Sequence, residues 1–363
     1  MDFLKGLSRE RRSDYITYAL VIVVFAIVQF LLANGAISSS LAGQLVPLCA
    51  SIVMAVSLNL VVGISGELSL GHAGFMSVGA FTSVVASAAL APLIPAAVPR
   101  LLLSMAIGGA FAAAAGFLIG IPVMRLQGDY LAIVTLAFGE IIKNVLNNLY
   151  VGVDDKGVHL SVTSTQSLGM DSAGKVVING PQGAVGIEKL SSFAIGFALV
   201  LFTLVIVLNL IRSRSGRAIM AIRDNRIAAE SVGINTTKYR MMAFVVSAAL
   251  AGMAGALYAM NYSSIVPKKF DFNTSILILV FVVLGGMGNI RGSVIAATLL
   301  TILPEFLRFM NDYRMLLYAV ILIGVMLVSN SQHLKDRIAW LKRRLMRDPD
   351  DDADAPLAEG GEA

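Results

Sequence analysis

The sequence has few charged residues. Only 14% of its 363 residues are Asp, Glu, Lys or Arg, whereas 57% are hydrophobic. Soluble globular domains contain about 25% charged residues, so the composition excludes a water-soluble enzyme of this length. The chain also has a single cysteine, Cys49, inside an apolar segment. An internal disulfide and a cysteine metal cluster are therefore excluded, and we expect Cys49 to be a small buried hydrophobic residue.

Motifs for chemistry are absent as well. The sequence contains no Walker-type phosphate loop, no paired carboxylates with a histidine, no metal-ligand cluster and no nucleophile elbow. We therefore expect no enzymatic activity, no cofactor and no metal in this chain. The formal net charge is +5, but the basic residues are not interleaved with exposed aromatic residues. This pattern does not indicate nucleic-acid binding.

Apolar segments dominate the rest of the sequence. A helix needs roughly 20 apolar residues to cross a bilayer. Ten segments approach this length: 16–33, 41–62, 74–94, 101–124, 130–149, 193–211, 241–260, 274–290, 293–309 and 315–329. The predicted fold class is all-α, a polytopic integral membrane protein with about ten hydrophobic segments. A basic arm, 1–15, precedes the first segment without a clear small-residue cleavage site, so we expect a retained helix rather than a signal peptide.

The basic residues also predict an orientation. If all ten segments cross and the N-terminus is cytoplasmic, nineteen Lys and Arg residues fall inside and eight outside. The positive-inside rule then places both termini in the cytoplasm. The longest polar stretch, 150–192, becomes external, and its "KVVI" segment is typical of a small hairpin. Such a long loop is either a docking surface for an external partner or an excursion without function.

The C-terminal end has two parts beyond the predicted transmembrane domain, 16–330. Residues 331–347 alternate apolar and basic groups, which predicts a basic interfacial helix on anionic lipid. Residues 348–363 are acidic, small and proline-containing, which predicts a disordered tail.

Residues 212–240, "RSRSGRAIMAIRDNRIAAESVGINTTKYR", are too polar to cross a membrane. Apolar residues recur at helical intervals among arginines, which predicts two short helices. Asp224 is expected to open one helix as its N-cap, and Gly233 is expected to close it in a left-handed conformation. Such a loop fits a groove in a partner protein. The alternative is an amphipathic helix on the membrane surface.

Five stretches in this order resemble the permease subunits of ATP-binding-cassette importers for branched-chain amino acids. They are "SLNLVVGISGELSLGHAGFMSVGAF" (57–81), "GDYLAIVTLAFGEIIKNVL" (128–146), "GRAIMAIRDNRIAAESVGIN" (216–235), "AFVVSAALAGMAGALYA" (243–259) and "VLGGMGNIRGSVIAA" (283–297). The similarity runs from about residue 15 to residue 330. Residues 228, 229 and 233 match the Ala-Ala-three residues-Gly of the importer coupling loop, although Ile227 occupies its Glu position.

This resemblance implies the importer permease fold and an assembly in the inner membrane. The implied partners are a second permease subunit, usually a different one, two cytoplasmic ATP-binding subunits and an external substrate-binding protein, with an amino acid as the small-molecule substrate. Within the chain, the candidate residues for coupling to the ATPase are Arg223, Asp224, Ala228, Ala229 and Gly233.

A glycine-rich stretch, 63–79, interrupts the apolar segments with "GISGELSLGHAGFMSVG". Irregular backbone survives in a membrane only where protein or a water-filled path surrounds it. A broken helix could present free backbone N–H groups to the carboxylate of an amino acid. Candidates for the translocation path are Gly66, Ser69, Gly71, His72 and Gly74. The alternatives are that the glycines only permit helix packing, that His72 is a hydrogen-bonded structural group, and that Glu67 is solvated.

Two further features belong to this hypothesis. Glu140, the last path candidate, lies three residues before Lys143 on one helical face, where the two side chains can neutralise each other or serve transport. A second glycine-rich break, "LGGMGNIRG", covers 284–292. The rival functions are a permease for urea or short amides and, in another class, an ion-coupled secondary transporter. The loop 212–240 favours the ATP-driven importer, because a self-sufficient carrier has no use for it.

Overall fold

The computed structural model describes residues 9–35, 38–126, 128–154, 157–170, 174–308 and 313–330. All ten predicted apolar segments coincide with helices. These helices are α1 (Arg9–Ala33), α2 (Ser39–Asn59), α3 (His72–Leu90), α4 (Ala97–Val123), α5 (Asp129–Asn147), α6 (Phe193–Arg212), α9 (Thr236–Ala259), α10 (Phe272–Gly285), α11 (Ile290–Phe306) and α12 (Arg314–Asn330). The predicted interfacial helix and acidic tail lie outside the described residues.

Five spans in the described part are long and apolar enough to cross a membrane. They are Ser40–Ile64, His72–Leu90, Ala97–Val123, Phe193–Arg212 and Thr236–Ala259. Together with the shorter apolar helices, they establish a multi-pass helical membrane protein. The chain forms two compact units, Met1–Glu305 and Phe306–Ala363. The described part of the second unit contains α12.

Small residues let the central helices of the first unit approach closely. Helix α9 packs against α2, α3 and α4. A Cβ atom added to Gly79 of α3 would lie only 2.2 Å from the Cα atom of Gly252 in α9. Close backbone approach at small residues is the usual basis of helix packing in membranes.

A small antiparallel sheet covers one end of this unit. Its strands β1 (Tyr150–Asp154), β2 (Gly157–Ser161), β3 (Lys175–Asn179), β4 (Ala184–Val185) and β5 (Ser264–Ile265) lie in the order β2-β1-β3-β4-β5. The "KVVI" segment forms β3, which pairs with both β1 and β4. The sheet is therefore larger than the expected hairpin, because residues 150–185 supply four strands and the loop after α9 adds β5.

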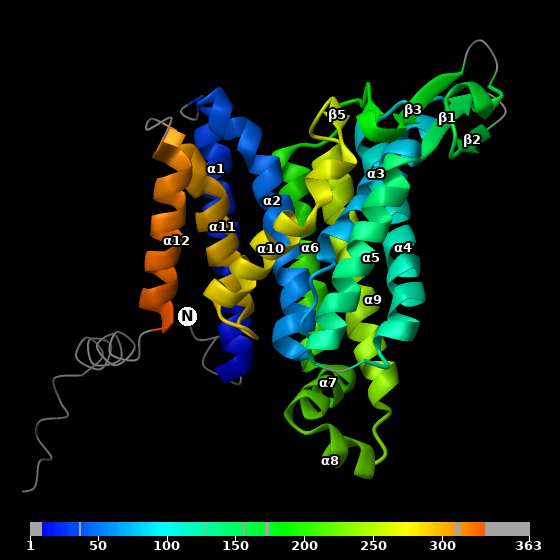
Figure 1. The fold of residues 1–363 in the computed structure, drawn as a ribbon. Coiled ribbons are helices and arrows are strands. Elements are labelled where there is room, and N and C mark those ends of the chain that lie inside the picture. Colours follow the sequence, from blue (N-terminus) through cyan, green and yellow to red (C-terminus); the bar gives the residue numbers. More distant parts are fainter. Residues whose placement is uncertain are drawn as a thin grey trace, which may run out of the picture. The chain divides into compact units, whose positions relative to one another are not determined.

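Residues 212–240 lie at the opposite end of the same helices, where they form α7 (Arg214–Asp224) and α8 (Arg226–Ser231) (Figure 1). The structure thus separates the two long polar loops, as a crossing by α6 requires. The predicted pair of short helices is present.

Candidate coupling loop and helix break

Side-chain caps determine where α7 and α8 begin. Ser213 precedes α7, and its Oγ accepts the Gly216 amide at 3.1 Å. Asn225 precedes α8, and its Oδ1 accepts the Ala228 amide at 3.0 Å. The prediction that Asp224 is the N-cap was therefore wrong by one residue. Asp224 ends α7, and its carboxylate pairs with the guanidinium of Arg223 at 2.9 Å.

The end of α8 follows the predicted geometry. Gly233 has φ +83°, a conformation that costs residues with a Cβ atom. Its amide donates to the Glu230 carbonyl at 3.0 Å, and the Ile234 amide donates to the Ala229 carbonyl at 3.1 Å. These bonds satisfy the last carbonyl groups of the helix.

The apolar residues of α7 and α8 divide between two environments. Ile219 and Ile222 are buried, and Ile219 packs in a cluster with Leu60, Ile64 and Ala243. On α8, Ile227 is 81% exposed, and Ala228 is exposed beside it. Ala229 is only 4% exposed. The expectation that Ala229 faces a partner is therefore wrong, because its side chain packs against its own protein.

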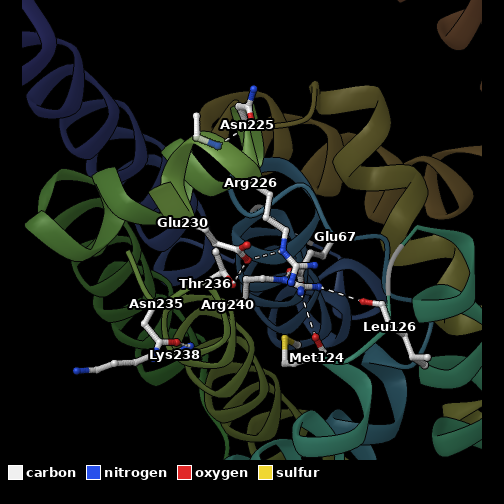
Figure 2. Close-up of polar contacts among 11 residues, drawn as sticks. Glu67, Met124, Leu126, Asn225, Arg226, Glu230, Asn235, Thr236, Lys238 and Arg240 are labelled. Atoms are coloured by element: carbon white, nitrogen blue, oxygen red, sulfur yellow. Dashed lines mark hydrogen bonds and ion pairs between the residues drawn. The ribbon is translucent and has the colours of Figure 1, made fainter. Parts of the chain in front are cut away.

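A polar network joins α8 to α9. Glu230 Oε1 accepts hydrogen bonds from Arg226 Nε at 2.9 Å and from Thr236 Oγ1 at 3.0 Å (Figure 2). The bonds from Arg226 and Thr236 lower the pKa of the Glu230 carboxyl. Asn235 then caps α9 by accepting the Lys238 amide at 3.0 Å. The turn between the two helices is thus held by polar side chains.

The glycine-rich stretch contains a true break in the helices. Helix α2 continues as a π-helical turn, η2 (Leu60–Ile64), residues 65–71 are not helical, and α3 begins at His72. Gly66 has φ +74° within this gap. We call residues 65–71 the break.

The second glycine-rich segment, 284–292, meets the first. A Cβ atom on Gly63 would lie 2.1 Å from the Gly288 nitrogen. Asn59 joins the two segments, since its Oδ1 accepts the Gly288 amide at 2.8 Å and its Nδ2 donates to Ser293 Oγ at 2.7 Å. Sequence reasoning missed Asn59, although a fully buried amide in an apolar helix requires such partners.

Arg223 connects α7 to this meeting point. Its Nη1 donates to the Gly63 carbonyl at 3.1 Å. Its aliphatic stem covers Gly66, where an added Cβ atom would lie 2.6 Å from the Arg223 Cγ atom. A predicted coupling residue therefore touches a predicted path residue directly.

Glu67 is buried in the break, so the alternative that it is solvated was wrong. It forms an ion pair with Arg240 of α9, and the two side chains are 8% and 7% exposed. Arg240 also donates to the Met124 carbonyl at 3.1 Å and the Leu126 carbonyl at 3.5 Å, just beyond α4 (Figure 2). Burial of two charges is tolerated here because each finds an opposite charge and Arg240 is further hydrogen-bonded.

The other path candidates lie against neighbouring helices. His72 is buried, and its Nε2 is 2.8 Å from Ser57 Oγ. Ser69 is buried, and its hydroxyl has no hydrogen-bond partner among the described residues. The amide of Leu70 donates to Thr135 Oγ1 at 3.1 Å, and that of Ala73 donates to Ser275 Oγ at 3.2 Å. These two N–H groups are therefore not free for a substrate carboxylate, contrary to expectation.

Gly71 and Gly74 bring the break close to α5. Added Cβ atoms would lie 2.1 Å from the Thr135 carbonyl oxygen and 2.9 Å from the Gly139 Cα atom, respectively. Glu140 pairs with Lys143, as the spacing predicts. Glu140 and Gly74 line one crevice, which has no room for a water molecule. In this conformation, therefore, the space beside Glu140 and Gly74 is closed to water.

Comparison with known proteins identifies the family. Residues 40–326 match the family described as the permease component of branched-chain amino acid transport systems. The chain belongs to this permease family. The resemblance in the five quoted stretches and the predicted polytopic helical fold are thereby confirmed, and the loop and break lie inside the matched residues.

Curated relatives carry the same description. The high-affinity branched-chain amino acid transport system permease protein LivM of Salmonella typhimurium is 35% identical over 61% of this chain and 54% of its own length. LivM of Escherichia coli gives the same values. BraD of Pseudomonas aeruginosa is 29% identical over 47% of this chain and 60% of its own. The chain thus spans about half the length of the LivM permeases it matches. No solved structure matches it.

Proposed function

We propose that this permease is the membrane subunit of an ATP-driven importer for branched-chain amino acids. The observation that carries the proposal is the contact between Arg223 of the loop and the Gly63 carbonyl of η2, directly before the break, within a chain of this permease family. The loop exposes Ile227 and Ala228 on its surface, and on its other side it contacts the broken helix through Arg223. This arrangement suits a loop that binds another protein and passes that protein's movement to the membrane helices.

The proposed partners supply the functions for which this chain has no sequence motif. It contains no nucleotide-binding loop, so two cytoplasmic ATP-binding subunits hydrolyse ATP and engage α7 and α8. A second permease completes the translocation path, and an external substrate-binding protein approaches the end that carries the sheet. The assembly lies in the inner membrane, with both termini of this chain in the cytoplasm.

The substrate is a neutral amino acid with an apolar side chain. Three relatives are named as branched-chain amino acid permeases, and the described helices that surround the break are predominantly apolar. Urea or a short amide is the rival substrate, and ion-coupled transport by this chain alone is the rival mechanism.

The test is reconstitution of the chain in proteoliposomes with the second permease, the ATP-binding subunits and the binding protein encoded beside it. We expect uptake of labelled leucine, isoleucine or valine that requires ATP, the binding protein and every subunit. Uptake of urea in place of leucine would overturn the substrate assignment. Sustained leucine uptake by this chain alone, driven by a proton or sodium gradient, would overturn the importer itself.

A further inference from the structure

Three contacts attach α7 and the start of α9 to the break. Ile219 of α7 packs with Leu60 and Ile64 of η2, directly before the break. Arg223 lies one helical turn further along α7 and reaches the same backbone. Arg240 follows the loop in the first turns of α9 and pairs with Glu67 inside the break. Helix α8, which carries the exposed apolar residues, lies between the two arginines in the sequence.

The break itself has little internal structure to fix its position. Its first amides still bond backward, Ser65 to the Leu60 carbonyl at 3.1 Å and Glu67 to the Val61 carbonyl at 3.0 Å. Beyond Glu67, the Leu70 amide donates to Thr135 Oγ1 of α5, and the Gly71 carbonyl accepts the Gly74 amide at 3.0 Å. The backbone bonds to the flanking helices thus reach only the two ends of the segment, so the position of its middle depends on the neighbours that hold it.

The two arginines hold it in different ways. Arg223 covers Gly66 and donates to the Gly63 carbonyl, and its side chain remains 37% exposed. Arg240 is buried and directs its planar guanidinium at one carboxylate and two carbonyl groups, a geometry that a lysine ammonium cannot reproduce. Arg240 therefore ties the break to the end of α4 as well as to α9.

We propose that Arg223 and Arg240 are positioning residues that make the break follow movements of the loop. In this arrangement, a displacement of α7 and α8 by an ATP-binding subunit is transmitted to residues 65–71 at two points. The inference rests on the proposed function of the loop. It goes further by assigning the transmission to two side chains.

The experiment compares Arg223→Met and Arg240→Lys with a matched control, Arg217→Met. Arg217 also lies on α7 and is exposed, and its Nη1 donates to the Arg212 carbonyl rather than to the break. Each variant is assembled into the complete complex in proteoliposomes. Leucine uptake and ATP hydrolysis are measured on the same preparation, together with hydrogen exchange at residues 65–71 with and without ATP.

We expect Arg223→Met and Arg240→Lys to hydrolyse ATP at nearly the wild-type rate while uptake per ATP falls about tenfold, as the loss of hydrogen bonds from a charged group predicts. ATP should alter hydrogen exchange at the break in the wild type and in Arg217→Met, and clearly less in Arg223→Met, which keeps only the Arg240 connection. Arg223 is partly exposed, so this variant decides the matter even if Arg240→Lys does not assemble.

The inference is overturned if uptake and hydrolysis fall in parallel, if neither falls, or if Arg217→Met behaves like Arg223→Met. These outcomes leave the proposed function intact as long as the wild-type complex transports leucine with ATP. A wild-type complex without such transport would instead contradict the proposed function.

Discussion

The Gly63 and Gly288 backbones touch where the two glycine-rich segments meet. A methyl group on Gly63 would lie 2.1 Å from the Gly288 nitrogen and 1.8 Å from Asn59 Oδ1. Neither neighbour can withdraw without loss of the 2.8 Å hydrogen bond between them. The contact explains the glycine at position 63, whereas Gly288 has φ +82°, a conformation that favours glycine by itself.

Gly63→Ala should destabilise the protein, because overpacking in a filled core costs about 1–3 kcal/mol. We expect a lower midpoint of thermal unfolding in detergent. Gly43→Ala in α2 is the matched control, because nothing lies within 4 Å of its added Cβ atom. Equal midpoints for the two variants would contradict the close approach.

Acidification should loosen the connection between α8 and α9. The hydrogen bonds from Arg226 and Thr236 lower the folded-state pKa of Glu230 below its ordinary value of 4.5. Their contribution to stability is therefore complete above pH 4.5 and is lost as the pH falls through the lower, folded-state pKa. Hydrogen exchange of the α8 amides, corrected for intrinsic rates, should accelerate in this range. Arg226→Met should reduce this pH dependence, and unchanged wild-type protection would contradict the network.

The sequence was informative wherever a local pattern determined the structure. Apolar length located all ten helices, and the glycine at position 233 predicted a left-handed helix end that is observed at φ +83°. The N-cap of α8 was misplaced because Asp224 and Asn225 are adjacent and both types cap helices well. Pattern alone could not choose between them.

Long-range partners could not be read from the sequence. Glu67 and Arg240 are separated by 173 positions, and nothing near Glu67 indicates which cation it meets. The burial of Ala229 could not be predicted for the same reason. Helical spacing shows which residues share a face of α8, but it does not show whether that face packs against the rest of the chain or is exposed. The addition of β5 to the sheet likewise depends on the residues before α6 meeting those after α9, where the amides of Leu190 and Ser191 donate to the Met260 carbonyl.

The outer sheet should contribute to productive docking of the binding protein. Leu160 lies in the edge strand β2, Val162 follows directly after that strand, and the two side chains are 68% and 74% exposed. Leu160→Ser with Val162→Ser should reduce uptake when the binding protein is limiting, because an exposed apolar patch is typical of an interaction site. Assembly with the ATP-binding subunits should be unchanged. Identical uptake across a binding-protein titration would leave the sheet without this role.

Ala228 and Gly233 provide the most direct test of the loop as the ATPase contact. Ala228 is exposed on α8 beside Ile227, so Ala228→Arg should leave the chain folded but clash with a groove that receives the helix. Ala229→Arg would be a poor test, because the new charge would enter the interior of this chain. Gly233→Val should also release the ATPase, since a β-branched residue is strained at φ +83°, whereas Gly233→Asn should be tolerated.

The measurement is co-purification of the ATP-binding subunits with each variant, together with substrate-stimulated ATP hydrolysis. An amphipathic helix lying on lipid predicts the opposite result, because an added arginine would strengthen contact with anionic headgroups. If Ala228→Arg and Gly233→Val both keep the ATPase and its stimulation at wild-type levels, the loop is not the coupling element. The carrier mechanism would then be favoured, because the loop was the sequence feature that argued against it.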